Sequence, residues 1–213
     1  MSSASPPDPL QQSLRFERAL LGLDRLTARA ALLGDAPLGA RLEAVVVPAL
    51  DRIGAAWERG DVALSQVYMA GRIAEELVGE LAPPPVPGAT PRVALALLED
   101  HHQLGKRMVA SMLAASGIEV ADLGRTTVDE LVRHVEQKRF EVLLVSVLML
   151  ASARRVGEVV ARVSSLPWRV RVLVGGAPFR LDPTLAARVG AHGWGASAGD
   201  AVRLVTAWQR GEP

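Results

Sequence analysis

Hydrophobic positions in the first third of the chain recur with the period of amphipathic helices. The pattern predicts one helix over residues 9–33, a second over 37–59, and a third over 61–81 that Asp61 would cap. If Pro48 breaks the second segment, this region holds four helices rather than three. Both readings predict a small helical bundle.

A proline-rich stretch ends this helical region. Residues 82–91 read Ala-Pro-Pro-Pro-Val-Pro-Gly-Ala-Thr-Pro. Successive prolines remove backbone donors and push the residues before them toward extended conformations, so the stretch is expected to be a semi-rigid linker. The sequence thus predicts a helical domain over residues 9–82, a linker over 83–91 and a second domain over 92–210.

Beyond the linker, short apolar runs alternate with helical patterns. Five such units imply a parallel sheet covered on both faces, and right-handed crossovers imply a flavodoxin-like doubly wound α/β fold with strand order 2-1-3-4-5. Ligands of open α/β sheets bind where the strand order reverses, here between the first and third strands. The predicted strands are 92–98, 118–123, 141–147, 170–174 and 192–194, and the predicted helices are 104–116, 127–138, 153–165, 183–189 and 198–209.

A histidine motif directly follows the first predicted strand. Residues 100–105 read Asp-His-His-Gln-Leu-Gly. Asp100 can accept the proton on one ring nitrogen of His102, which fixes the tautomer and makes the other nitrogen a better metal ligand. Gly105 lets the backbone pass close to a bulky group. His101 is the rival ligand, but only His102 has an aspartate two residues before it and a glycine three residues after it. The motif is typical of a single-histidine ligand loop for a large cofactor.

Two more elements follow in order along the chain. Ser146-Val147-Leu148 ends the third predicted strand, and Gly175-Gly176 follows the fourth. Together with the histidine motif, they resemble the signature of the cobalamin (B12)-binding family, which is Asp-x-His-x-x-Gly, then Ser-x-Leu, then Gly-Gly. The resemblance covers roughly residues 90 to 210. It implies that His102 is an axial ligand of cobalt in a bound corrinoid, with Asp100 behind it.

The resemblance also implies roles for the neighbouring residues. The nucleotide tail of the cofactor would be buried in the α/β domain, and Ser146 would hydrogen-bond Asp100 or the tail. Gly175 and Gly176 would leave room for the tail. Taken singly, the serine is explained by a turn and the glycines by a loop, whereas the ordered set favours a cofactor site. The residues expected to line the pocket wall are Leu148, Ala177 and Pro178.

The helical region carries a second resemblance. Residues 53–60, Ile-Gly-Ala-Ala-Trp-Glu-Arg-Gly, and the pattern that follows them are similar to the helical cap that precedes the B12 domain in two groups of proteins. These groups are the corrinoid methyl-carrier proteins and the cobalamin-dependent light sensors. The resemblance implies that the cap covers the upper face of the corrin. Trp57, Tyr68 and Met69 are the candidates for contacts with that face, and ordinary bundle core is the alternative for each.

The two groups imply different functions. Light-sensing repressors carry Glu-His where this chain has Val67 and Tyr68, and a DNA-binding domain for which this chain has no room. Methyl carriers match better in length and layout, although this chain has Glu99 in place of their glycine and Met-Leu-Ala-Ser over 149–152 in place of a threonine-rich stretch. The favoured function is a carrier subunit, rather than a stand-alone enzyme, that holds a methyl group on cobalt between methyltransferase partners. The alternative is a light sensor or regulator that acts through a protein partner.

Composition limits these expectations further. The chain has 213 residues, of which 49% are hydrophobic and 22% charged, and its net charge is +1. A near-neutral chain without a Lys/Arg-rich run gives no reason to expect direct nucleic-acid binding. The absence of cysteine excludes disulfides and thiolate ligands. With no visible signal peptide or membrane span, the expected location is the cytoplasm. Methylcobalamin and adenosylcobalamin both remain open as the bound form, as does a homo-oligomer.

Overall fold

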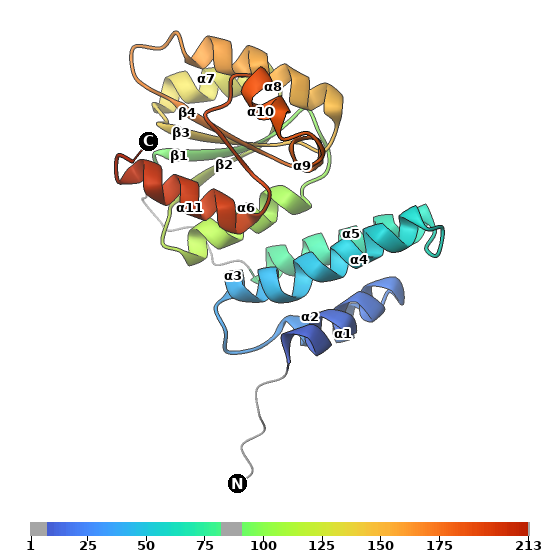
Figure 1. Ribbon diagram of the computed structural model, residues 1–213. Coiled ribbons are helices and arrows are strands. Elements are labelled where there is room, and N and C mark those ends of the chain that lie inside the picture. The colour runs from blue at the N-terminus through green and yellow to red at the C-terminus, as the bar shows by residue number, and fades with distance from the viewer. Residues whose placement is uncertain (1–7, 82–90, 213) are drawn as a thin grey trace. The chain divides into compact units, whose positions relative to one another are not determined.

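The computed structural model describes residues 8–81 and 91–212, which fall into two compact units, here called the N-terminal and C-terminal units. Figure 1 shows helices in the N-terminal unit and alternating strands and helices in the C-terminal unit. The predicted domain boundary at 82–83 and nearly all of the predicted linker lie outside the described residues. No helix in the described ranges is long and apolar enough to cross a membrane.

The N-terminal unit is a helical bundle, as predicted. Its core is made of large side chains that are almost fully buried: Phe16, Leu20, Leu32, Leu42, Ile53 and Leu77. Its elements are α1 (Pro9–Leu21), α2 (Arg25–Leu32), α3 (Leu38–Arg41), a π-helical turn η1 (Leu42–Val46), α4 (Val47–Glu58) and α5 (Leu64–Leu81).

The prediction of one continuous helix over residues 9–33 is wrong, because the structure has two helices there, α1 and α2. The chain leaves α1 at Gly22, and Leu23 adopts a positive φ of 57° that no continuing helix allows. The Asp24 side chain then accepts a hydrogen bond from the backbone N–H of Thr27 and caps α2. The unit therefore has four helical segments, which are α1, α2, the continuous run from α3 to α4, and α5. The extra break lies between α1 and α2 and not at Pro48.

Pro48 lies inside a continuous helical run instead of breaking it. The π-helical turn η1 directly precedes α4, and Pro48 is the second residue of that helix, so the proline follows a local change in the helical hydrogen-bond pattern. The predicted cap at Asp61 is also wrong. The third helix begins at Leu64, and the Asp61 carboxylate accepts a hydrogen bond from Arg59.

The C-terminal unit is the predicted flavodoxin-like doubly wound sheet. All strand pairs are parallel, and the order is β2-β1-β3-β4-β5, which confirms the predicted topology. Its strands are β1 (Val93–Leu98), β2 (Val120–Thr126), β3 (Val142–Ser146), β4 (Arg171–Gly175) and β5 (Gly193–Gly195). Its helices are α6 (Leu104–Ala115), α7 (Val128–Lys138), α8 (Leu150–Val163), α9 (Ala177–Leu181), α10 (Thr184–Arg188) and α11 (Ala198–Gln209).

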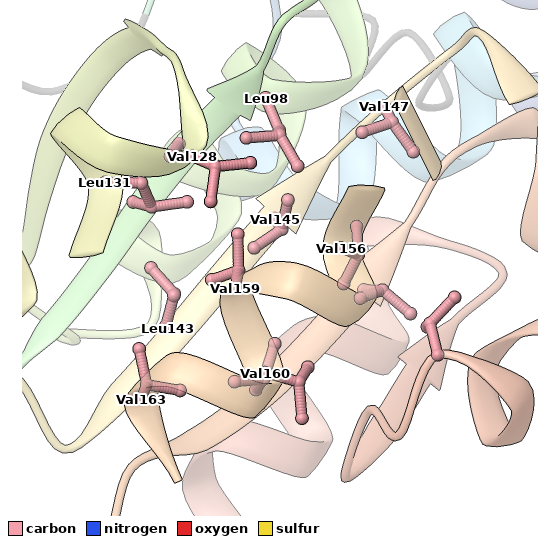
Figure 2. Close-up of a cluster of buried hydrophobic side chains, with 14 of the residues drawn as sticks. Leu98, Val128, Leu131, Leu143, Val145, Val147, Val156, Val159, Val160 and Val163 are labelled. Carbon is pink, nitrogen blue, oxygen red and sulfur yellow. The ribbon is translucent and has the colours of Figure 1, made fainter. Parts of the chain in front are cut away.

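Alternate residues of β1, an inner strand of the sheet, supply two hydrophobic clusters, one on each face of the sheet. Val93 and Leu95 belong to a cluster with residues of α6 and α11. Ala94, Ala96 and Leu98 belong to a larger cluster with residues of α7 and α8. Figure 2 shows part of this larger cluster, in which valines of α8 lie against leucine and valine side chains of β3. Both faces are therefore covered, which explains why every residue of β1 is apolar.

Three elements differ from the prediction at the end of the sheet that matters for ligand binding. Helix α8 begins at Leu150 rather than 153, the short helix α9 was not predicted, and β2 extends to Thr126. The strand register is unaffected by these differences. Leu97 of β1 pairs with Ser146 of β3, which pairs in turn with Gly175 of β4. The ends of these three strands therefore meet at one edge of the sheet.

Candidate cofactor-binding site

His102 and Asp100 lie in the loop between β1 and α6 and contact each other directly. Nδ1 of His102 is 2.8 Å from Oδ1 of Asp100. The His102 side chain is 54% exposed, whereas that of Asp100 is 1% exposed. His101 is exposed, and the hydrogen bond it makes to Asp100 comes from its backbone N–H. Of the two histidines, His102 is therefore the one whose ring is oriented by the buried carboxylate.

The Asp100 carboxylate also joins two loops. Oδ1 accepts hydrogen bonds from the backbone N–H groups of His101 and His102, and Oδ2 accepts from those of Leu148 and Met149 at 2.7 and 3.0 Å. The latter two groups lie just before α8, where the helix dipole favours a negative charge. The loop after β1 is thus attached to the loop after β3.

These contacts decide the ionisation of Asp100 and the tautomer of the His102 ring. Burial raises the pKa of the Asp100 carboxyl, but the hydrogen bonds from the His102 ring and the surrounding backbone amides outweigh it and hold the pKa well below its usual range. An ionised carboxylate only accepts hydrogen bonds, so Nδ1 of His102 must carry the proton. In the neutral ring, Nε2 then has a free lone pair that can bind a metal.

Ser146 and Gly105 lie next to each other, on the side of the sheet that α6 and α11 cover. A Cβ placed on Gly105 would be 3.7 Å from Oγ of Ser146, and one on Gly175 would be 3.5 Å from the carbonyl oxygen of Gly195. Both positions would be ordinary contacts. The sequence offered Asp100 or the cofactor tail as the hydrogen-bond partner of Ser146. The Asp100 carboxylate instead accepts its hydrogen bonds from the loop amides and from the His102 ring.

Gly176 is required by the packing of the chain itself. Its φ of +121° is open almost only to glycine, and a Cβ there would lie 1.7 Å from the carbonyl oxygen of Val147. This contact was not expected from the sequence, where the glycine pair was interpreted only as room for a ligand. Gly176 therefore holds the end of β4 close to the end of β3.

Three consecutive apolar side chains are exposed at the end of the loop after β3 and the start of α8. Leu148, Met149 and Leu150 are 41%, 55% and 49% exposed. A neighbouring open groove with a cavity volume of about 310 Å³ is lined by Leu148 and Leu150, by Ala177 and Pro178, and by residues of α8, α9 and α10. Pro178 itself is buried. The expected wall residues thus border an apolar surface next to the His102 loop.

Trp57, Tyr68 and Met69 lie on α4 and α5 of the N-terminal unit. They are 48%, 62% and 41% exposed, so none of them forms part of the bundle core. The core of this unit is filled by other side chains, of which Ile53 of α4 and Leu77 of α5 are examples. The three residues are therefore available for a contact outside the bundle.

Several charged residues next to the site were not identified from the sequence. Lys106 is almost fully buried and both oxygens of Asp122 on β2 lie 2.5 Å from its Nζ, so the first turn of α6 is attached to the sheet. Glu99 binds Arg155 of α8 through both carboxylate oxygens. In the sequence, the position of Lys106 directly after Gly105 was the one available signal. The ion pairs themselves could not be read from it, because Asp122 is 16 residues from Lys106 and Arg155 is 56 residues from Glu99.

Comparison with known proteins places the site in context. Residues 92–203 match a family described as the B12 binding domain, and residues 15–82 match a second family of the same description. Dimethylamine corrinoid protein 2 of Methanosarcina mazei is 30% identical over 161 residues, which is 72% of this chain and 74% of that protein. The trimethylamine corrinoid protein of Methanosarcina barkeri is 36% identical over 119 residues, or 54% of each chain.

A solved structure supports the same fold. The monomethylamine corrinoid protein of Methanosarcina barkeri superimposes with a TM-score of 0.76 and 21% sequence identity. The alignment covers 93% of this chain and 98% of that one. At this identity the likeness shows a shared fold.

Proposed function

Because the chain belongs to the B12-binding domain family, we propose that it binds a corrinoid and carries a methyl group on the cobalt between methyltransferase partners. The observation that carries the proposal is the hydrogen bond between Nδ1 of His102 and the buried Asp100 carboxylate. It leaves Nε2 of an exposed ring able to bind a metal, in the loop that follows the inner strand β1.

The residues of the site suit a corrinoid. His102 would serve as the single protein ligand of a corrinoid, whose cobalt would supply the chemistry that takes up and releases the methyl group. Leu148, Met149 and Leu150 offer exposed apolar surface for a large flat ring. Ser146, beside Gly105 and in register with Gly175, is our candidate for hydrogen bonding to the buried tail.

His102 and Asp100 act as a unit in this proposal. Asp100 fixes the ring orientation of His102 and makes its Nε2 more basic, which strengthens coordination. A cobalt held by Nε2 of His102 would supply the methyl-transfer chemistry, and the buried Asp100 carboxylate would keep the ring in the tautomer that can coordinate it.

The exposed residues of the N-terminal unit have a separate role. Trp57, Tyr68 and Met69 would contact the upper face of the corrin and shield its methyl group. Their exposure on the bundle supports this role, because a contact outside the bundle core is required. Methyl carriage also needs partners, and several relatives that match over most of this chain are named dimethylamine corrinoid proteins.

The proposal is tested by methyl transfer. The protein is reconstituted with methylcobalamin that carries a ¹⁴C-methyl group and incubated with the methyltransferases encoded beside its gene. We expect loss of label from the protein and its appearance on the acceptor of one of them. An Arg162→Met variant, which alters the exposed far end of α8, serves as the matched control and should transfer equally. Stoichiometric loading without any enzyme-dependent loss of label would contradict the proposal.

A further inference from the structure

Glu99 connects β1 to the His102 loop in an unusual backbone conformation. Its φ of 46° lies in the left-handed region, which disfavours residues with a Cβ. Its N–H donates to the carbonyl of Thr126, and its own carbonyl accepts from Oγ of Ser152 at 3.0 Å. A glycine would adopt this backbone more readily. The presence of glutamate therefore calls for an explanation in its side chain.

The Glu99 side chain pairs with Arg155 of α8. Nη1 of Arg155 lies 2.7 and 2.8 Å from the two carboxylate oxygens, and the Glu99 side chain is only 20% exposed. Glu158 holds Arg155 in place from the next turn of α8, with hydrogen bonds of 3.1 and 2.9 Å. Glu158 therefore orients the Arg155 guanidinium that binds Glu99.

The ion pair and the neighbouring aspartate attach the same loop to the same helix. Asp100 binds the backbone amides just before α8, and Glu99 binds the second turn of that helix. Because Asp100 directly follows Glu99, the loop cannot move away from α8 without breaking both sets of contacts. Any such movement would also carry the carboxylate that orients His102.

We propose that Glu99 and Arg155 are positioning residues for His102. Their ion pair holds the loop of residues 99–102 against α8 and so favours the state in which the histidine binds cobalt. Neither residue contacts the metal; they act through Asp100. This inference rests on the proposed function for its cobalt ligand, whereas the positioning of the loop is a property of the protein without cofactor.

The first experiment therefore uses the cofactor-free protein. Hydrogen exchange is measured at the backbone amides of His101 and His102, which donate to Asp100. Arg155→Met should speed their exchange roughly two- to fivefold, the range expected for a partly exposed ion pair. The matched control is Arg162→Met on the same helix, which removes the ion pair with Asp129 far from the loop and should leave these amides unchanged. Equal exchange in wild type and Arg155→Met would overturn the proposal.

A second variant separates the backbone from the side chain. Glu99→Gly removes the carboxylate but relieves the left-handed strain, so it should raise the thermal stability while it speeds exchange in the loop. A general loss of structure cannot produce this combination. If Glu99→Gly protects the His101 and His102 amides as well as wild type does, the ion pair does not position the loop.

The third measurement uses cobalamin-loaded protein. Added cyanide competes with the histidine for cobalt, and the absorbance spectrum follows the exchange. The cyanide concentration at half-conversion should fall roughly two- to fivefold in Arg155→Met, in line with the effect on the loop. An unchanged half-conversion point would overturn the effect on coordination. Failure of the wild type to bind cobalamin would instead contradict the proposed function, and the exchange test would still stand.

Discussion

Replacing Asp100 by asparagine tests the role of the buried carboxylate most severely. The two carboxylate oxygens accept from four backbone N–H groups and from Nδ1 of His102, and the side chain is 1% exposed. Asparagine has one acceptor oxygen and one NH₂ donor. Either orientation of the amide therefore sets the NH₂ against backbone N–H groups that need an acceptor.

The two orientations have different consequences for His102. If the NH₂ replaces Oδ2, the amides of Leu148 and Met149 lose their acceptor and the ring keeps its tautomer. If it replaces Oδ1, the ring must accept at Nδ1, so Nε2 carries the proton and cannot bind a metal. In both cases two partly buried hydrogen bonds from backbone N–H groups lose their acceptor, which at about 1–3 kcal/mol for each corresponds to a loss of roughly 2–6 kcal/mol of stability. Loss of such a partner typically lowers metal affinity or activity by about 10–100-fold.

The assay is urea unfolding of the cofactor-free protein at several pH values. The folded pKa of Asp100 is lowered, so the unfolded state binds more protons as the pH falls. Its contribution to stability is present above the unfolded pKa of about 3.9 and is lost below it. The stability difference between wild type and Asp100→Asn should thus shrink from pH 5 to pH 3. A small difference that does not change with pH would refute the reasoning, and the exposed carboxylate variant Asp129→Asn should show little effect at pH 5.

Two other predictions test the packing and the function. Gly176→Ala should lower the free energy of unfolding by about 3 kcal/mol or more. The new Cβ would clash with the Val147 carbonyl, and alanine would also have to adopt a φ that is open almost only to glycine. Gly124→Ala, which has a positive φ but open space, should lose only about 1–2 kcal/mol by the same denaturation assay, and equal losses would contradict the packing argument. Illumination of the adenosylcobalamin-loaded protein should leave its elution from a sizing column unchanged, and a light-driven change in assembly would favour a sensor.

The sheet could be predicted because local signals agreed with the global arrangement. The run over residues 93–98 is apolar throughout, as a strand buried on both faces must be, and glycines and prolines mark the ends of most elements. The break between α1 and α2 was missed because the apolar pattern continues through it. Asp24, two residues after Gly22, was the available signal for a helix cap.

The site could be predicted only as far as its contacts are local. Asp100 and His102 are two residues apart, so their pairing follows from the motif. The contacts of Asp100 with the amides before α8, and of Glu99 with Arg155, join segments about fifty residues apart. They depend on how α8 follows β3 in space, which local motifs and hydrophobic periodicity do not show. The same holds for Gly176, which is required because of the carbonyl of Val147, the residue directly after β3.

The most direct test of the account is electron paramagnetic resonance of the Co(II) form of the loaded protein. The axial nitrogen splits each cobalt line into three when it is ¹⁴N and into two when it is ¹⁵N. We predict that each cobalt line is split into two in protein that is labelled with ¹⁵N-histidine and loaded with unlabelled cobalamin. His102→Ala should lose this splitting. Three lines from the labelled protein would show that the nitrogen comes from the cofactor's own base and would contradict His102 as the cobalt ligand.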